Sequence, residues 1–90
     1  MRKLDYSDIE EGLIFRYGND KNRAGDIAGI KCIIVAYHKD KDDEHCWVKT
    51  LEPTLHIKAG YKYEDSIYDI IKSGSTLITE ERKAYHPTWW

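Results

Sequence analysis

Apolar positions gather most densely in residues 31–38 and 45–51, KCIIVAYH and HCWVKTL, where β-branched and aromatic side chains dominate. Such runs are typical of β-strands. The six residues between them, KDKDDE, are all charged and cannot be buried. They must form a solvated turn, so the pattern predicts a β-hairpin.

The hairpin also predicts a register. If His38 faces His45 across the turn, Cys32 lies opposite Leu51. Side chains alternate between the two faces of a strand. The set assigned to the core contains Ile33, Val35, Tyr37, Cys46, Val48 and Thr50, and the other face carries Ile34, Ala36 and Trp47.

Shorter signals fill the N-terminal third of the chain. Ser7 and Glu10 match a capping box for a single helical turn. Residues 13–17 have period two, with Leu13, Phe15 and Tyr17 on one face, and predict the first strand. Residues 18–29 contain three glycines among asparagines and aspartates, which predicts a long loop.

The second half predicts one helix and a last strand. Pro53 ends the strand of the hairpin, and residues 55–57 are a candidate for a further short strand. Ile67, Ile70 and Ile71 have helical spacing, so we expect a helix near residues 64–73. Residues 76–79 then predict the final strand, and residues 80–90 form a polar-to-aromatic tail.

These elements indicate one mainly β (α+β) domain spanning residues 1–90, a size at which a single core just suffices. Their order resembles the small Src-homology-3-like barrel. The resemblance is topological, covers about half the chain and rests on residues 8–16, DIEEGLIFR, and residues 47–53, WVKTLEP. It implies about five strands on a scaffold that binds proteins, RNA, DNA or small ligands, so it does not decide the function.

Charge excludes some partners. With 14 basic and 16 acidic residues the formal net charge is −2, which creates no strong field towards nucleic acid or anionic lipid. No apolar run is long enough for a signal peptide or a membrane span, so we expect a cytoplasmic protein without a membrane partner. Abundant Ile, Lys, Tyr and Asp favour an A/T-rich gene, typical of a low-GC bacterium or a phage.

The cysteines and histidines of the hairpin are not expected to bind each other or a metal. In the register above, Cys32 and Cys46 are separated by about 17 Å along the ladder, beyond the reach of a disulfide. We expect two reduced thiols. Zinc needs ligands that converge on one point, which Cys32, Cys46, His38 and His45 do not do. No metal or other cofactor is predicted.

The glycine-containing loop lacks the Gly-Lys-Ser/Thr ending and the following helix of a phosphate-binding loop. Arg16 and Arg23 remain candidates for contact with a partner protein.

Basic and aromatic residues interleave in residues 56–63 and again in residues 82–86. Lysines that neutralise phosphates beside tyrosines that stack on bases are typical of single-strand binding. The candidate nucleic-acid set is Lys58, Tyr61, Lys62, Tyr63, Arg82 and Lys83. The alternative is that the tyrosines cover the core and the lysines are solvated.

Two tryptophans near the C-terminus offer a large apolar surface. They either fold back on the barrel or dock on a partner. Tryptophan and tyrosine dominate interface hot spots, so the candidate protein-binding set is Trp47, Tyr85, Trp89 and Trp90 together with Arg16 and Arg23.

No nucleophile has a recognisable base in a known arrangement, so we do not expect an enzyme. The leading hypothesis is a small protein-binding module, a monomer or weak homodimer. One form of it is an inhibitor of a host or defence protein, encoded by a phage or mobile element and acting by aromatic and acidic surface contacts. The alternative is a small β-barrel that binds RNA or single-stranded DNA.

Overall fold

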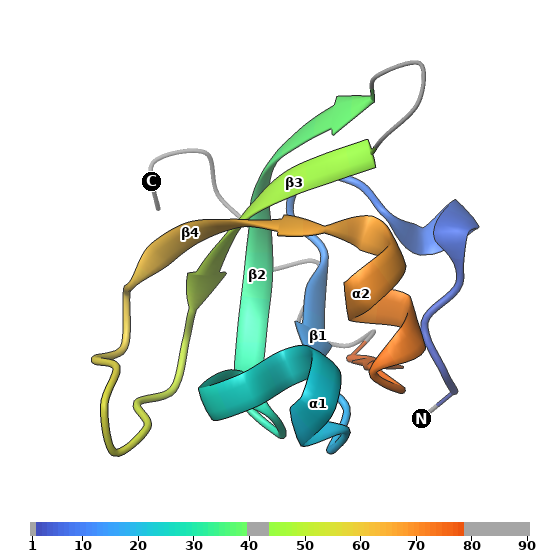
Figure 1. Ribbon diagram of the computed structural model, residues 1–90. Helices are drawn as coiled ribbons and strands as arrows, with labels where there is room; N and C mark the ends of the chain where they lie inside the picture. Colours follow the sequence, from blue (N-terminus) through green and yellow to red (C-terminus); the bar gives the residue numbers. More distant parts are fainter. Residues whose placement is uncertain (1, 40–43, 79–90) are drawn as a thin grey trace.

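The computed structural model describes residues 2–39 and 44–78, which form one five-stranded antiparallel sheet (Figure 1). The strands are β1 (Ile14–Arg16), β2 (Lys31–Lys39), β3 (Glu44–Thr50), β4 (Lys62–Ser66) and β5 (Thr76–Leu77), in the order β4-β3-β2-β1-β5. The helices are α1 (Lys21–Ala24) and α2 (Ile67–Lys72), with 3₁₀ turns η1 (Tyr6–Asp8) and η2 (Gly25–Ile27). The predicted mainly β class, with a short helix before the last strand, is confirmed.

The central hairpin contains an irregularity that the sequence pattern did not reveal. His38 pairs with His45, as predicted, but the register shifts between Ile34 and Ala36. The extra residue, Val35, is accommodated as a β-bulge. Upstream of the bulge, Cys32 therefore lies opposite Thr50 and not opposite Leu51.

Upstream of the bulge this one-residue shift exchanges the two faces of β2, whereas beyond it Tyr37 packs on the main core as predicted. Cys32 and Ile34 share the main core with Val48, so the assignment of Ile33 and Val35 to that core is wrong. Both are buried in a second apolar cluster on the opposite face of the sheet, with Ile14 and Ile78 as its other buried members and Leu51 packed against it. The main core cluster contains Leu4, Ile9, Leu13, Phe15, Tyr17, Ala24, Ile27, Cys32, Ile34, Cys46, Val48, Ile67, Ile70 and Leu77.

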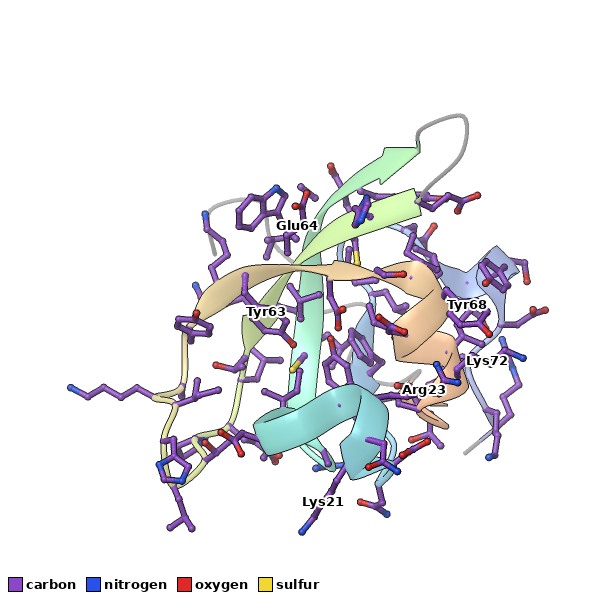
Figure 2. The ribbon with its side chains drawn as sticks, viewed as in Figure 1. Lys21, Arg23, Tyr63, Glu64, Tyr68 and Lys72 are labelled. Carbon is purple, nitrogen blue, oxygen red and sulfur yellow. The ribbon has the colours of Figure 1, made fainter. Side chains whose placement is uncertain are left out.

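The two helices lie on the same side of the sheet (Figure 1). They are held together at the surface by Arg23 of α1, whose guanidinium lies 3.6 Å from the Asp69 carboxylate and 5.6 Å from the Tyr68 ring centre. Lys72 approaches the same ring at 5.6 Å, and Figure 2 shows both cations gathered around Tyr68. These contacts fix the segment before η2 against α2.

Three local predictions change with tertiary structure. The predicted loop of residues 18–29 contains α1, whose N-cap Asp20 accepts a hydrogen bond from the Asn22 amide. Residues 55–57 form a turn and not a strand. The predicted helix begins only at Ile67, because the residues before it pair with β3 as strand β4.

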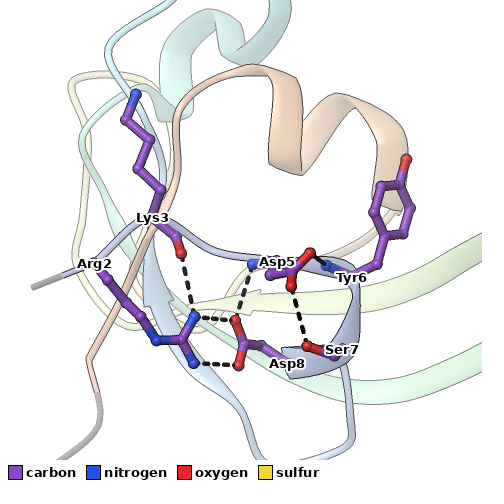
Figure 3. Close-up of polar contacts among 6 residues, drawn as sticks. All are labelled: Arg2, Lys3, Asp5, Tyr6, Ser7 and Asp8. Carbon is purple, nitrogen blue, oxygen red and sulfur yellow. Dashed lines mark hydrogen bonds and ion pairs between the residues drawn. The ribbon is translucent and has the colours of Figure 1, made fainter.

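The N-terminal capping box is shifted from its predicted place. Asp5, not Ser7, caps η1, and the Asp8 carboxylate accepts a hydrogen bond from the Asp5 amide at 2.9 Å (Figure 3). Arg2 holds the same carboxylate with two hydrogen bonds of 2.7 and 2.6 Å. Residues 2–4 thereby run along the edge of β5, where Lys3 bridges to Thr76.

Gly18 is required by a close approach between the segment that follows β1 and the backbone at the end of α2. A Cβ atom at this position would lie 1.7 Å from the Ser73 carbonyl oxygen, far inside van der Waals contact. The Ser73 side chain is itself fixed by a hydrogen bond of 2.7 Å to the Ile70 carbonyl. The backbone of Gly18 therefore sets the distance between the sheet and α2.

No helix in the described part of the chain is long and apolar enough to cross a membrane.

Candidate functional site

Three surface hollows border the connection between β3 and β4, residues 51–61. One hollow of about 300 Å³ is lined by Ala24, Asp26, Ile27, Ile57, Tyr61 and Tyr63. A second of about 300 Å³ is lined by Lys21, Gly25, Asp26, Ala28, Thr54, Leu55 and His56. A third of about 490 Å³ is lined by residues 56–61 themselves. Figure 1 shows this connection beside α1 at the lower end of the molecule. We call it the β3–β4 loop.

The tip of the β3–β4 loop is a turn built around Thr54. The Thr54 amide donates to the Ile57 carbonyl at 2.7 Å. Its hydroxyl oxygen accepts from the amides of His56 and Ile57 at 3.0 and 2.9 Å. A hydroxyl that bonds the backbone two and three residues ahead is a common way to fix a turn. The shape of the tip is therefore set within the loop.

The base of the loop is fixed by Thr50, which is fully buried. The Thr50 hydroxyl donates to the Lys58 carbonyl at 3.0 Å and accepts from the Tyr61 amide at 3.1 Å. The Thr50 carbonyl accepts from the Gly60 amide at 2.7 Å, where Gly60 has a φ of 90°. Both the tip and the base are thus internally hydrogen-bonded, so the loop loses little conformational entropy on binding.

Leu55 lies at the tip of this turn with 98% of its surface exposed. A leucine side chain gains about 1.5–3 kcal/mol on burial. Thr54 and His56, on either side of it in sequence, are polar, and in this turn it is Ile57 and not Leu55 that packs against the core. Leu55 therefore offers a binding partner apolar surface that folding leaves unused.

The first hollow forms an apolar groove between η2 and β4. Ala24 and Ile27 are buried at its base, and Ile57 and Tyr63 are half-buried in its walls. Tyr61, 52% exposed, stacks on Tyr63 with ring centres 5.7 Å apart and an interplanar angle of 22°. We call this hollow the tyrosine groove.

The ring of Tyr63 is held in place from beneath. Its hydroxyl donates to the Tyr17 hydroxyl at 2.8 Å, which in turn donates to the Asp65 carboxylate at 2.7 Å. Burial raises the pKa of both tyrosines, and the neighbouring Asp65 raises them further. Burial also raises the pKa of Asp65, while the hydrogen bond from Tyr17 opposes that shift. This buried network makes the wall of the tyrosine groove rigid.

Asp26 borders both the tyrosine groove and the second hollow. Its carboxylate takes part in no hydrogen bond or ion pair with another residue of the described chain. The second hollow also contains Lys21 and His56. The rim is therefore charged, whereas the walls of the tyrosine groove are apolar.

The predicted protein-binding residues do not form one surface. Trp47, 37% exposed, and Arg16 are on the sheet face opposite the helices. Arg16 is engaged by the Glu52 carboxylate at 2.9 Å and the Gly29 carbonyl at 2.8 Å. Arg23 lies across the sheet, bound to Tyr68 and Asp69. Tyr85, Trp89 and Trp90 lie outside the described residues.

The alternative nucleic-acid set is partly brought together. Lys58, Tyr61 and Lys62 are exposed around the base of the β3–β4 loop. Tyr61 stacks on one face of the Tyr63 ring, and the Tyr63 hydroxyl is hydrogen-bonded to Tyr17. Arg82 and Lys83 lie outside the described residues.

The described hairpin residues hold no metal cluster: no group of three or more His, Cys, Asp or Glu side chains in the described chain could hold an ion. Cys32 and Cys46 are buried, free thiols, as the sequence predicted. Burial raises the pKa of each to about 12, so neither is a thiolate near neutral pH.

Sequence reasoning missed the residues that build this site: Thr54, Leu55, Ile57, Asp26 and Ile27. The alternation of Leu55 and Ile57 favours a strand, although Thr54 followed by Leu55 and His56 also fits a hydroxyl-capped turn. No local signal indicated that η2 packs beside this turn.

Comparison with protein-family models, with curated proteins and with solved structures finds no match to this chain. The structure defines a small, mainly β domain whose hydrogen-bonded loop carries one exposed leucine, Leu55, beside a groove.

Proposed function

We propose that this chain is a small protein-binding module whose contact surface is the β3–β4 loop together with the tyrosine groove. The observation that carries this proposal is Leu55, 98% exposed at the tip of a turn fixed by three hydrogen bonds. Leu55 lines the second hollow, next to the tyrosine groove, and the turn already holds it in place. A partner that buries Leu55 therefore gains apolar contact without the entropic cost of ordering the loop.

The resemblance to a Src-homology-3-like barrel is part of the proposal. Its support is the strand order, in which the last strand, β5, pairs with the first, β1, and the other strands follow as a meander. That fold carries many unrelated activities, so the function rests on the loop and not on the fold.

The finer hypothesis is an inhibitor of a host or defence protein, made in a bacterial cytoplasm by a phage or mobile element. Composition supports the phage or mobile-element source, since the Ile, Lys, Tyr and Asp bias is typical of A/T-rich genes. An inhibitor acts by occupying a surface and needs no catalytic group or cofactor. A rigid loop with one exposed apolar tip suits such an activity.

The alternative, binding of RNA or single-stranded DNA, is favoured by one observation: exposed Tyr61 lies between Lys58 and Lys62 in sequence and at the base of the loop. Glu64 and Asp65 follow directly in β4 and weaken the attraction for phosphate. Retention on heparin or oligo-dT at physiological salt, with affinity falling steeply between 50 and 200 mM salt, would favour this alternative over a protein partner.

The test uses capture from a nuclease-treated cell lysate by the full chain and two matched variants. Leu55→Glu removes the apolar tip without touching the core, and Tyr6→Glu makes the same kind of change at Tyr6, 49% exposed in η1. We expect a protein bound by the wild type and by Tyr6→Glu to be lost from Leu55→Glu. Equal capture by the wild type and both variants would overturn the proposal, as would a protein captured from untreated lysate but not from nuclease-treated lysate.

A further inference from the structure

The residues that line the tyrosine groove indicate which chemical groups a partner would present to it. Its walls are contributed by Ala24, Ile27, Ile57, Tyr61 and Tyr63, and the Tyr63 hydroxyl is turned away into the buried bond with Tyr17. A volume of about 300 Å³ suits one large apolar side chain. No lysine or arginine lines this hollow, so it does not favour a phosphate-bearing ligand.

The rim adds a charge. Asp26 borders the tyrosine groove and the neighbouring hollow at the same time, so a chain that fills the first hollow and continues into the second passes Asp26. That carboxylate has no internal cation in the described chain. A cationic side chain next to the apolar one would supply its partner.

We propose that the tyrosine groove binds an extended segment of a partner protein in which a large apolar residue is adjacent to arginine or lysine. The apolar side chain occupies the space between Ile27, Ile57 and Tyr63, and the cation pairs with Asp26. This inference rests on the proposed function and names the partner chemistry of the same site.

Lys21 and His56 line the second hollow and could favour an acidic residue of the partner in place of a basic one. If their charge dominated the rim, an acidic residue beside the apolar one would bind better. Asp26 is the only one of the three that also borders the tyrosine groove, so it is nearest to the residue that follows the buried side chain. The sign of the charge preference is therefore a direct test.

The experiment is a titration of the ¹⁵N-labelled full chain with capped dipeptides, followed by amide chemical shifts. The probes are acetyl-Leu-Arg-amide, acetyl-Leu-Glu-amide and acetyl-Gly-Arg-amide. We expect saturable shifts at Ala24, Ile27 and Ile57 with the first probe. Its affinity should exceed that of the second by about fivefold, as a partly exposed ion pair allows. The third probe should give no saturable shifts there.

Two variants of equal charge assign the effect. Asp26→Asn should remove the preference for arginine over glutamate while leaving the leucine-dependent shifts in place. Glu11 is an exposed residue that lines neither hollow, so Glu11→Gln should leave both the arginine preference and the leucine-dependent shifts unchanged. Absence of groove shifts with every probe, an equal response to the arginine and glutamate peptides, or a preference for glutamate would each overturn the proposal.

Failure here is distinct from failure of the proposed function. If no dipeptide binds but lysate capture still depends on Leu55, the chain is a protein-binding module with a different recognition chemistry. If the dipeptides bind as expected but capture does not depend on Leu55, the groove assignment stands and the role of the loop tip is wrong.

Discussion

The Tyr17 hydroxyl donates a 2.7 Å hydrogen bond to the Asp65 carboxylate, across 48 residues of sequence. Tyr17 follows β1 and is only 2% exposed, while Asp65 belongs to the edge strand β4. The bond joins the segment after β1 to β4, and β2 and β3 separate these two strands in the sheet. The Tyr17 hydroxyl also accepts a hydrogen bond from the Tyr63 hydroxyl and so holds the Tyr63 ring in place. Core and candidate site therefore share one polar network.

Tyr17→Phe should lower the free energy of unfolding by about 1–3 kcal/mol, because it removes the donor to Oδ2 of the partly buried Asp65 and the acceptor of the Tyr63 hydroxyl. Asp65 keeps the hydrogen bond from the Ser66 amide, which donates to Oδ1. Tyr68→Phe is the matched control, since Tyr68 is 49% exposed and its ring, not its hydroxyl, makes the contacts with Arg23 and Lys72. Urea denaturation of both variants measures the difference. Equal stabilities would show that the network contributes nothing.

The two buried thiols should be unreactive in the folded protein. Cys32 and Cys46 are fully buried, and burial raises the pKa of each to about 12, so both accessibility and thiolate content are low. We expect a thiol reagent such as DTNB at pH 8 to modify them in native buffer only at the rate of unfolding. In the denaturing control, about 6 M guanidinium, both thiols should react at once. Rapid modification of either thiol in native buffer would contradict the burial.

Much of the fold could be predicted because its signals are local. Leu13, Phe15 and Tyr17 alternate as a strand should, and Ile67, Ile70 and Ile71 have helical spacing. The bulge at Val35 could not be predicted. Residues 32–36 are apolar without a break, and both faces of β2 are buried, so alternation does not mark the faces.

Strand β4 was missed for a different reason. Its sequence, KYEDS, has only one aromatic residue and no apolar alternation, so local propensity favours a helix start or a turn. It is a strand because it pairs with β3 from Lys49 to His45, a contact that appears only in the folded chain. The candidate site depends on the same kind of contact, since the β3–β4 loop becomes a groove wall only where η2 packs beside it.

Gly18→Ala should destabilise the domain by on the order of 3 kcal/mol, because the new methyl group overlaps the Ser73 backbone and the chain must move apart. Gly25→Ala is the comparison, since it strains the backbone at a φ of 60° but meets no atom within 4 Å. The distinguishing measurement is amide hydrogen exchange. Protection at Ile70 and Ile71 should fall in Gly18→Ala and persist in Gly25→Ala, and equal protection in both would refute the close approach.

The ion pair between Arg16 and Glu52 should make stability depend on pH in acid. Arg16 and the Lys31 amide hold the pKa of Glu52 in the folded protein below its ordinary value. The ionised Glu52 therefore stabilises the fold fully above the ordinary pKa of about 4.3, and this stabilisation is lost as the pH falls through the lowered pKa. With exposures of 38% and 36%, the pair contributes about 0.5–1 kcal/mol. Glu52→Gln should therefore melt below the wild type at pH 7 and converge with it in strong acid, whereas exposed Glu11→Gln should follow the wild type throughout. Glu52→Gln melting that parallels the wild type at every pH would show that the pair is without effect.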